Sequence, residues 1–151
     1  MLRTGKNGTR VVSAPRARTN LGKLLRQVKD EERFAAPEPE VLRVIHPALP
    51  DHPGHALWAR DFKGSSGLFS IVLKPAPQKA VDALLDAVEL FGMGYSWGGF
   101  ESLVIPFDCT SYRTASKWAP GGPALRLHIG LENVEDLKAD LTRGFKAFNA
   151  A

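Results

Sequence analysis

Residues 68–91 read LFSIVLKPAPQKAVDALLDAVELF, and this stretch contains a strand and a helix in succession. Leu68–Leu73 is an apolar run with the length of a strand. Beyond the prolines, apolar side chains recur at helical spacing with charged residues off the stripe, at Val81, Leu84, Leu85, Val88 and Phe91. The spacing predicts an amphipathic helix that ends at Gly92, because glycine is typical of helix C-termini.

The segments around this stretch add further elements. We predict strands at Val41–Ile45, Ser102–Phe107 and Leu125–Ile129, and one or two helical turns at Ala56–Phe62. A last helix follows Asn133, a plausible N-cap residue with Asp136 three positions on. It buries an apolar stripe of Val134, Leu137, Leu141, Phe145 and Phe148. The loops are too short for repeated crossovers, so we expect an α+β fold: a two-layer sandwich with a largely antiparallel sheet.

Length and composition narrow the class of protein. The chain has 151 residues, the length of a single domain. Its only cysteine, Cys109, leaves no internal disulfide and suits a reducing, cytoplasmic setting. No apolar run reaches the ~18 residues that span a bilayer, and the first residues lack the order of a signal peptide. We expect a cytoplasmic protein without membrane contact.

Residues 1–40 differ in composition from the remainder. They hold nine Lys/Arg and five acidic residues, so they account for the whole formal net charge of +4. Leu21, Leu24, Leu25 and Val28 have the spacing of a short helix, and a proline-broken linker follows. A basic arm can neutralise phosphates, but scattered charges without aromatic residues form no stacking platform. We therefore expect a disordered or adventitious leader at 1–40, a domain at 41–151, and no nucleic-acid binding.

Three histidines, His46, His52 and His55, lie within ten residues. A metal site needs ligands that converge from rigid elements. Two of these histidines lie on a loop rich in proline and glycine. We therefore expect a hydrogen-bonded turn here and no metal site.

A Ser–His–acid triad can be assembled on paper from Ser96 or Ser102, His128 and Asp108. Such a nucleophile normally stands on a G-x-S-x-G elbow. The sequence contains no such elbow, so we do not predict a triad.

Two other features can line a binding site. Tyr95, Ser96 and Trp97 precede a Gly-Gly pair, so they either line a pocket or form a packed aromatic turn. Strand alternation places Arg126 and His128 on one face of their strand. An arginine held on a strand is aimed to bind a carboxylate with two hydrogen bonds. The alternative is an arginine that faces solvent.

From about Val41 to Phe148 the chain resembles the C-terminal domain of cystathionine β-lyase, in the Cys/Met-metabolism family of pyridoxal-phosphate enzymes. The resemblance implies the small domain of a fold-type-I enzyme, with helices on one face of the sheet. The Ser96-Trp97-Gly98-Gly99 turn and the His128-Ile129-Gly130 ending point to the β-lyase branch. The stretches that carry the resemblance are HPALP at 46–50, GH at 54–55, Trp58, RDF at 60–62, GSSGLFS at 64–70, YSWGGFESL at 95–103 and LRLHIGLE at 125–132.

The resemblance implies a role for each candidate residue. Arg126 matches the arginine that binds the substrate α-carboxylate, and Ser96 matches a serine near the cofactor-bearing lysine. Tyr95 and Trp97 match positions that shape the substrate pocket. The implied reaction is α,β-elimination of L-cystathionine to homocysteine, pyruvate and ammonia, with pyridoxal 5'-phosphate as cofactor. Enzymes of this family are homotetramers.

The larger domain that supplies the Schiff-base lysine in the family has no counterpart here, so the resemblance implies no catalytic residue in this chain. We expect a truncated chain that binds no cofactor covalently and is inactive alone. Residues 1–40 match the family poorly. Two alternatives stay open: a stand-alone binding module with a basic leader, and a fragment of a cystathionine γ-lyase or γ-synthase relative.

Overall fold

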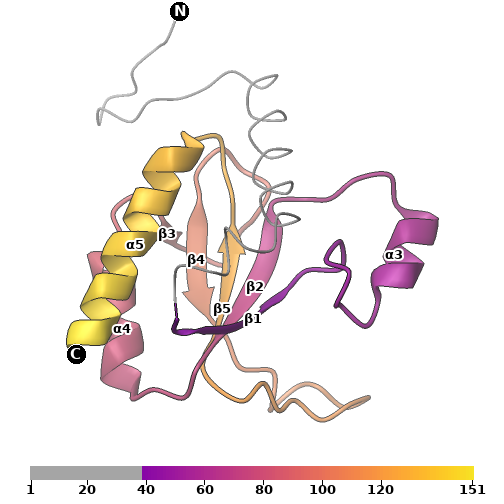
Figure 1. Cartoon of the computed structure of the whole chain (residues 1–151), viewed down its shortest axis with the longest axis horizontal. Helices are drawn as coiled ribbons and strands as arrows, with labels where there is room; N and C mark the ends of the chain where they lie inside the picture. Colours follow the sequence, from indigo (N-terminus) through magenta and orange to yellow (C-terminus); the bar gives the residue numbers. More distant parts are fainter. Residues whose placement is uncertain (1–38) are drawn as a thin grey trace, which may run out of the picture.

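The computed structural model describes residues 39–151. The short helix expected at Leu21–Val28 and all but the end of the basic leader lie outside the described residues. Five strands form one sheet in the order β1-β2-β5-β4-β3 (Figure 1). Their bounds are β1 Val41–Ile45, β2 Leu68–Leu73, β3 Gly92–Met93, β4 Leu103–Pro106 and β5 Ala124–His128.

The sheet is largely antiparallel, as the sequence predicts. β2 pairs antiparallel with both β1 and β5, and β5 also pairs antiparallel with β4. β5 is therefore the central strand, where Leu127 lies opposite Phe69 on one side and Val104 on the other. Only the short pairing of β3 with β4 is parallel among the described strands.

Helices α4, Gln78–Ala87, and α5, Val134–Ala150, pack against each other beside the sheet (Figure 1). Alternate strand residues point toward this pair because successive side chains of a strand face opposite sides. The short helix α3, His55–Asp61, projects away from the sheet at the other side of the molecule (Figure 1). The buried core between helices and sheet is formed by Phe69, Ile71, Leu73, Ala80, Val81, Leu84, Phe91, Val104, Leu125, Leu127, Ile129, Val134, Leu137, Phe145 and Phe148. The expected α+β sandwich is confirmed.

The prediction that the first long helix runs to Gly92 is wrong, because α4 ends at Ala87. The amides of Glu89, Leu90 and Phe91 donate instead to the carboxylate of Asp140 on α5, at 2.9, 2.8 and 3.1 Å. Phe91 is nevertheless buried in the core. The apolar stripe was identified correctly, but a buried carboxylate distant in sequence takes the backbone donors that would continue the helix.

Strand β3 was not predicted, since two residues are too few to show a period. Its Gly92 amide donates to the carbonyl of Ser102 at 2.9 Å. The start of α5 was predicted correctly: the Asn133 side chain accepts a hydrogen bond from the Glu135 amide at 2.8 Å. In the part of the chain that the structure describes, no helix has the length and apolar character needed to cross a membrane.

Candidate functional site

Arg126 lies on the central strand β5, between Ser70 of β2 and Ile105 of β4. Its side chain is tied to the turn that follows β3: Nη2 donates to the carbonyl of Tyr95 at 2.7 Å and to that of Ser96 at 3.3 Å. The residue is half-buried. The structure thus brings together Arg126, Tyr95 and Ser96, three of the predicted site residues, through the backbone of the turn.

His128 holds the second half of the same turn. Its ring is buried, and Nε2 lies 3.1 Å from the Gly98 amide nitrogen and 3.2 Å from the Gly99 carbonyl oxygen. Gly98 has φ +80°, a left-handed conformation that favours glycine. The sequence marks His128 as a triad candidate and as part of the His128-Ile129-Gly130 ending, but it does not indicate this role, although alternation places His128 beside Arg126 on one face.

The far end of the turn is fixed by Glu132. Its buried carboxylate accepts hydrogen bonds from the Ser102 amide at 2.6 Å and the Ser102 hydroxyl at 2.8 Å. The same hydroxyl accepts from the Gly130 amide at 2.9 Å. A Cβ atom at Gly130 would overlap the carbonyl of Phe100, so this approach requires glycine. Residues 126, 128, 130 and 132 therefore each contact or support the 95–102 segment.

The side chains of the turn point to solvent. Tyr95 is 82% exposed, Trp97 64% and Phe100 60%, and the neighbouring Met93 is 61% exposed. Ser96 is also exposed. The backbone of the turn is held firmly while its aromatic side chains remain uncovered, so this is not an aromatic turn packed into the core.

The three histidines form hydrogen-bonded turns, as expected. His46 Nδ1 accepts from the Ala48 amide at 3.2 Å, His52 Nδ1 accepts from the Gly54 amide at 3.0 Å, and His55 Nδ1 lies 3.1 Å from the Pro47 carbonyl. Burial lowers the pKa of His46, while a backbone hydrogen bond with Ser66 raises it. Within residues 39–151, no group of three or more His, Cys, Asp or Glu side chains could hold a metal ion.

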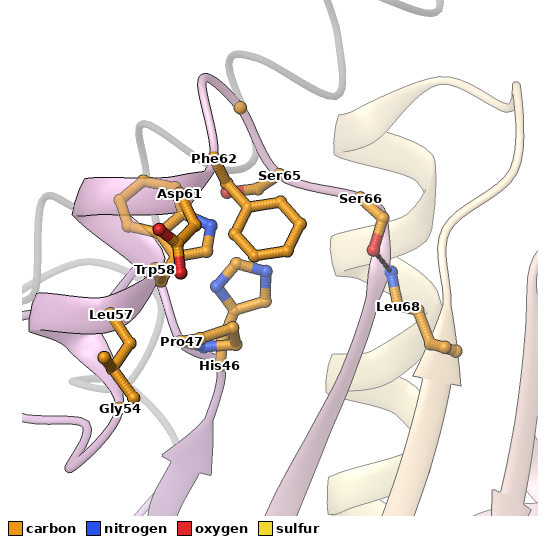
Figure 2. Close-up of a pocket in the computed structure, with 11 residues that line it drawn as sticks. His46, Pro47, Gly54, Leu57, Trp58, Asp61, Phe62, Ser65, Ser66 and Leu68 are labelled. Carbon is orange, nitrogen blue, oxygen red and sulfur yellow. Dashed lines mark hydrogen bonds between the residues drawn. The ribbon is translucent and has the colours of Figure 1, made fainter.

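A pocket of about 410 Å³ lies beside α3, where His46, Trp58, Asp61 and Phe62 face the same hollow (Figure 2). Asp61 is paired with Arg60 at 2.6 Å, and the Ser66 hydroxyl accepts from the Leu68 amide at 3.4 Å. Neither Arg126 nor any residue of the 95–102 turn lines this pocket. It is therefore separate from the site on β5.

No triad is assembled from the serines, His128 and Asp108. The Asp108 carboxylate accepts hydrogen bonds from the Thr110 hydroxyl and, at 2.7 Å, from the Thr110 amide, and these two bonds lower its pKa. Ser102 is bound to Glu132, and His128 is bound to the glycine backbone. Asp108, Ser102 and His128 are thus each bound to other partners, so hydrolytic chemistry of this kind has no support here.

The fold and the arginine-bearing strand define the small domain of a fold-type-I pyridoxal-phosphate enzyme. A cystathionine γ-synthase from Xanthomonas oryzae pv. oryzae, solved in complex with cystathionine, superposes with a TM-score of 0.68 at 32% identity, over 88% of this chain and 35% of that one. The sequence model of the Cys/Met metabolism PLP-dependent enzymes matches residues 32–146. The chain belongs to this family.

Individual relatives agree with that assignment. A putative cystathionine β-lyase of Rhizobium johnstonii is 54% identical over 74% of this chain and 29% of its own length. The cystathionine β-lyase of Salmonella typhimurium is 49% identical over 83% of this chain and 34% of its own length. The cystathionine γ-lyase of Mus musculus is 38% identical over 76% of this chain and 30% of its own length. The chain thus spans about a third of the length of these relatives.

The family's cofactor is pyridoxal phosphate, and the described residues can be tested for a fit to it. Every lysine between residues 39 and 151 is at least partly exposed. A lysine that carries the cofactor must lie in a shielded site where its ammonium group can lose a proton. These residues therefore do not fit covalent attachment of the cofactor.

Proposed function

We propose that this chain is the C-terminal part of a cystathionine β-lyase-like enzyme, in which Arg126 binds the α-carboxylate of L-cystathionine. The supporting observation is that this guanidinium has no acidic partner among the described residues. Among the described residues Arg126 takes part in no ion pair, although it is half-buried on the central strand. A guanidinium in that position gains most from an anionic ligand.

The backbone of the turn orients the arginine for this role. The Tyr95 and Ser96 carbonyls accept from Nη2, and no described residue hydrogen-bonds Nη1 or Nε. The N–H groups on Nη1 and Nε therefore remain free to donate to an anionic ligand. Binding the α-carboxylate there would fix one end of the substrate beside the turn.

We propose that Ser96, Tyr95 and Trp97 surround the substrate bound at Arg126. Ser96 lies next to the reacting end of the substrate, and Tyr95 and Trp97 form walls of the pocket with their exposed side chains. When bound by the rest of the enzyme, pyridoxal phosphate supplies the electron sink for α,β-elimination, which with water gives homocysteine, pyruvate and ammonia. We propose that the complete enzyme is a cytoplasmic homotetramer.

A chimera tests the activity. Residues 41–151, from the start of β1, would replace the matching segment of the Salmonella typhimurium cystathionine β-lyase, which is 49% identical. We expect pyruvate and homocysteine from L-cystathionine. The full 151-residue chain with added pyridoxal phosphate should release neither product. A folded, cofactor-loaded chimera without turnover would contradict the proposal.

The same chimera separates the β-lyase from a γ-lyase relative. Elimination at the γ-carbon would release cysteine and a four-carbon oxo acid in place of homocysteine and pyruvate. The higher identity to the β-lyases, 54% and 49% against 38% for the mouse γ-lyase, favours β-elimination. Predominant release of cysteine would assign the chain to the γ-lyase branch.

The role of Arg126 is tested by Arg126→Leu in the chimera. Loss of a charge-assisted hydrogen-bonding partner costs about 1.5–3 kcal/mol, so we expect KM to rise about 10- to 100-fold with a smaller change in kcat. The control is Arg113→Leu, since Arg113 lies in an exposed loop where it contacts Ser116 and the ring of Trp118. An unchanged KM in Arg126→Leu would contradict the proposal that Arg126 binds the substrate α-carboxylate.

A further inference from the structure

We infer that His128 is a positioning residue, which holds the 95–99 turn against β5 and thereby sets the orientation of the Arg126 guanidinium. The inference deepens the proposed function, because it concerns the same turn and the same arginine. Its physical content, a hydrogen-bonded link from His128 to Arg126 through the backbone of the turn, does not require any particular substrate.

The geometry places the two side chains at opposite ends of one short segment. Arg126 and His128 are two residues apart on β5, so their side chains leave the same face about 6.6 Å apart. Arg126 donates to the carbonyls of Tyr95 and Ser96. His128 contacts the amide of Gly98 and the carbonyl of Gly99. Only Trp97 lies between the two attachment points, so movement of one half of the turn is passed to the other.

Hydrogen bonds, rather than packing, hold this turn in place. A Cβ atom at Gly98 or Gly99 would meet nothing within 4 Å, and the side chains of Tyr95 and Trp97 are exposed. Within residues 39–151, His128 is the only hydrogen-bonding partner of the Gly98 amide and of the Gly99 carbonyl. Removing the imidazole would therefore leave Gly98 and Gly99 without a hydrogen bond to the sheet, while the next residue stays attached through the Leu131 amide and the Phe100 carbonyl at 2.8 Å.

A neutral imidazole suits both contacts. It has one N–H donor and one acceptor nitrogen. With the proton on Nε2, that atom donates to the Gly99 carbonyl at 3.2 Å while Nδ1 accepts from the Gly98 amide at 3.3 Å. An apolar ring of similar size would fill the same buried volume and make neither contact. This difference separates a positioning role from one of filling space.

The experiment compares His128→Phe with His128→Gln in the isotopically labelled full chain. Phenylalanine keeps the ring and loses both hydrogen bonds, whereas glutamine keeps a donor and an acceptor. NMR would follow exchange of the Gly98 amide with solvent and rotation of the Arg126 guanidinium about its Nε–Cζ bond. For His128→Phe we expect about tenfold faster amide exchange and a clearly faster guanidinium rotation, and for His128→Gln values close to those of the unchanged chain.

A matched control is His52→Phe, which removes a similar contact to the Gly54 amide in another turn. It should alter neither signal. If His128→Phe does not fold, His128→Ala takes its place, with thermal unfolding as the check. An unchanged Arg126 rotation in a folded variant without the imidazole would overturn the inference, as would equal effects of phenylalanine and glutamine.

These signals need no substrate, so their outcome is distinguishable from failure of the proposed function. A chimera that lacks lyase activity would leave the NMR result as it stands. Conversely, Arg126→Leu could raise KM as expected while the His128 variants leave the Arg126 rotation unchanged. That result would refute only the positioning role.

Discussion

His46 is a buried titratable residue whose protonation should be measurable in the stability of the protein. Its side chain is 2% exposed, and burial lowers its pKa below the ordinary value of 6.5. The Ser66 backbone opposes this shift, and the charge of His52 adds to it. The folded state therefore favours the neutral imidazole, as expected for a ring that lines the apolar pocket beside Trp58 and Phe62.

We predict that stability is fully present above pH 6.5 and falls as the pH drops through 6.5 toward the lowered pKa, because the unfolded state binds a proton before the folded state does. Urea unfolding at several pH values across this window would measure the loss. His46→Gln should flatten the dependence, while His55→Gln, which leaves His46 in place, should preserve it. A slope unchanged by His46→Gln would show that other groups cause it.

At the scale of elements, Asp140 determines how α4 passes into β3. Its carboxylate is 1% exposed, accepts three consecutive amides after α4, and pairs with Arg143 of the next helical turn. Arg143 also donates to the Ala87 carbonyl at 2.9 Å, at the last residue of α4. One carboxylate thus joins the two helices that cover the sheet.

We predict that Asp140→Ala lowers the free energy of unfolding by about 3 kcal/mol or more, because three buried or half-buried amides lose their acceptor. Asp140→Asn retains one acceptor oxygen and should cost less. Chemical denaturation would measure both. The exposed Asp136 on the same helix is the control, where alanine should cost about 0.5 kcal/mol. Equal losses at the two positions would contradict the prediction.

The same residue shows why the sequence predicts elements better than their ends. Leu68–Leu73 is a local apolar run and Val134–Ala150 carries an apolar stripe at helical spacing, so both elements were predicted. The end of α4 depends on a side chain some fifty positions away. The role of His128 was missed for a similar reason: alternation places it beside Arg126, but its contacts with Gly98 and Gly99 arise only in the folded chain.

At the scale of the whole molecule, half of the large apolar side chains that are exposed within residues 39–151 lie in one segment. Met93, Tyr95, Trp97 and Phe100 belong to this segment; the others are Leu42, Leu57, Phe62 and Tyr112. Exposed apolar surface of this kind marks an interaction site. The chain spans about a third of the length of its relatives, so under the proposed function the remainder of the enzyme covers the 93–100 segment.

The fluorescence of Trp97 can show whether the 93–100 segment is covered, because Trp97 is 64% exposed. Trp58 and Trp118 are half-buried. We predict that acrylamide quenches Trp97 strongly in the chain alone, so Trp97→Phe should remove most of the quenchable fluorescence while Trp58→Phe should not. In the chimera with the larger domain, the quenching constant of Trp97 should fall at least about twofold, as expected when an exposed apolar side chain enters an interface. Any tryptophan of the larger domain would add to the signal, so the measurement uses a chimera variant in which Trp97 is the only tryptophan. Equal quenching in the chain and in a folded chimera would place the 93–100 segment on the outside of the complete enzyme, and Tyr95 and Trp97 would then lose their proposed role as walls of the substrate pocket.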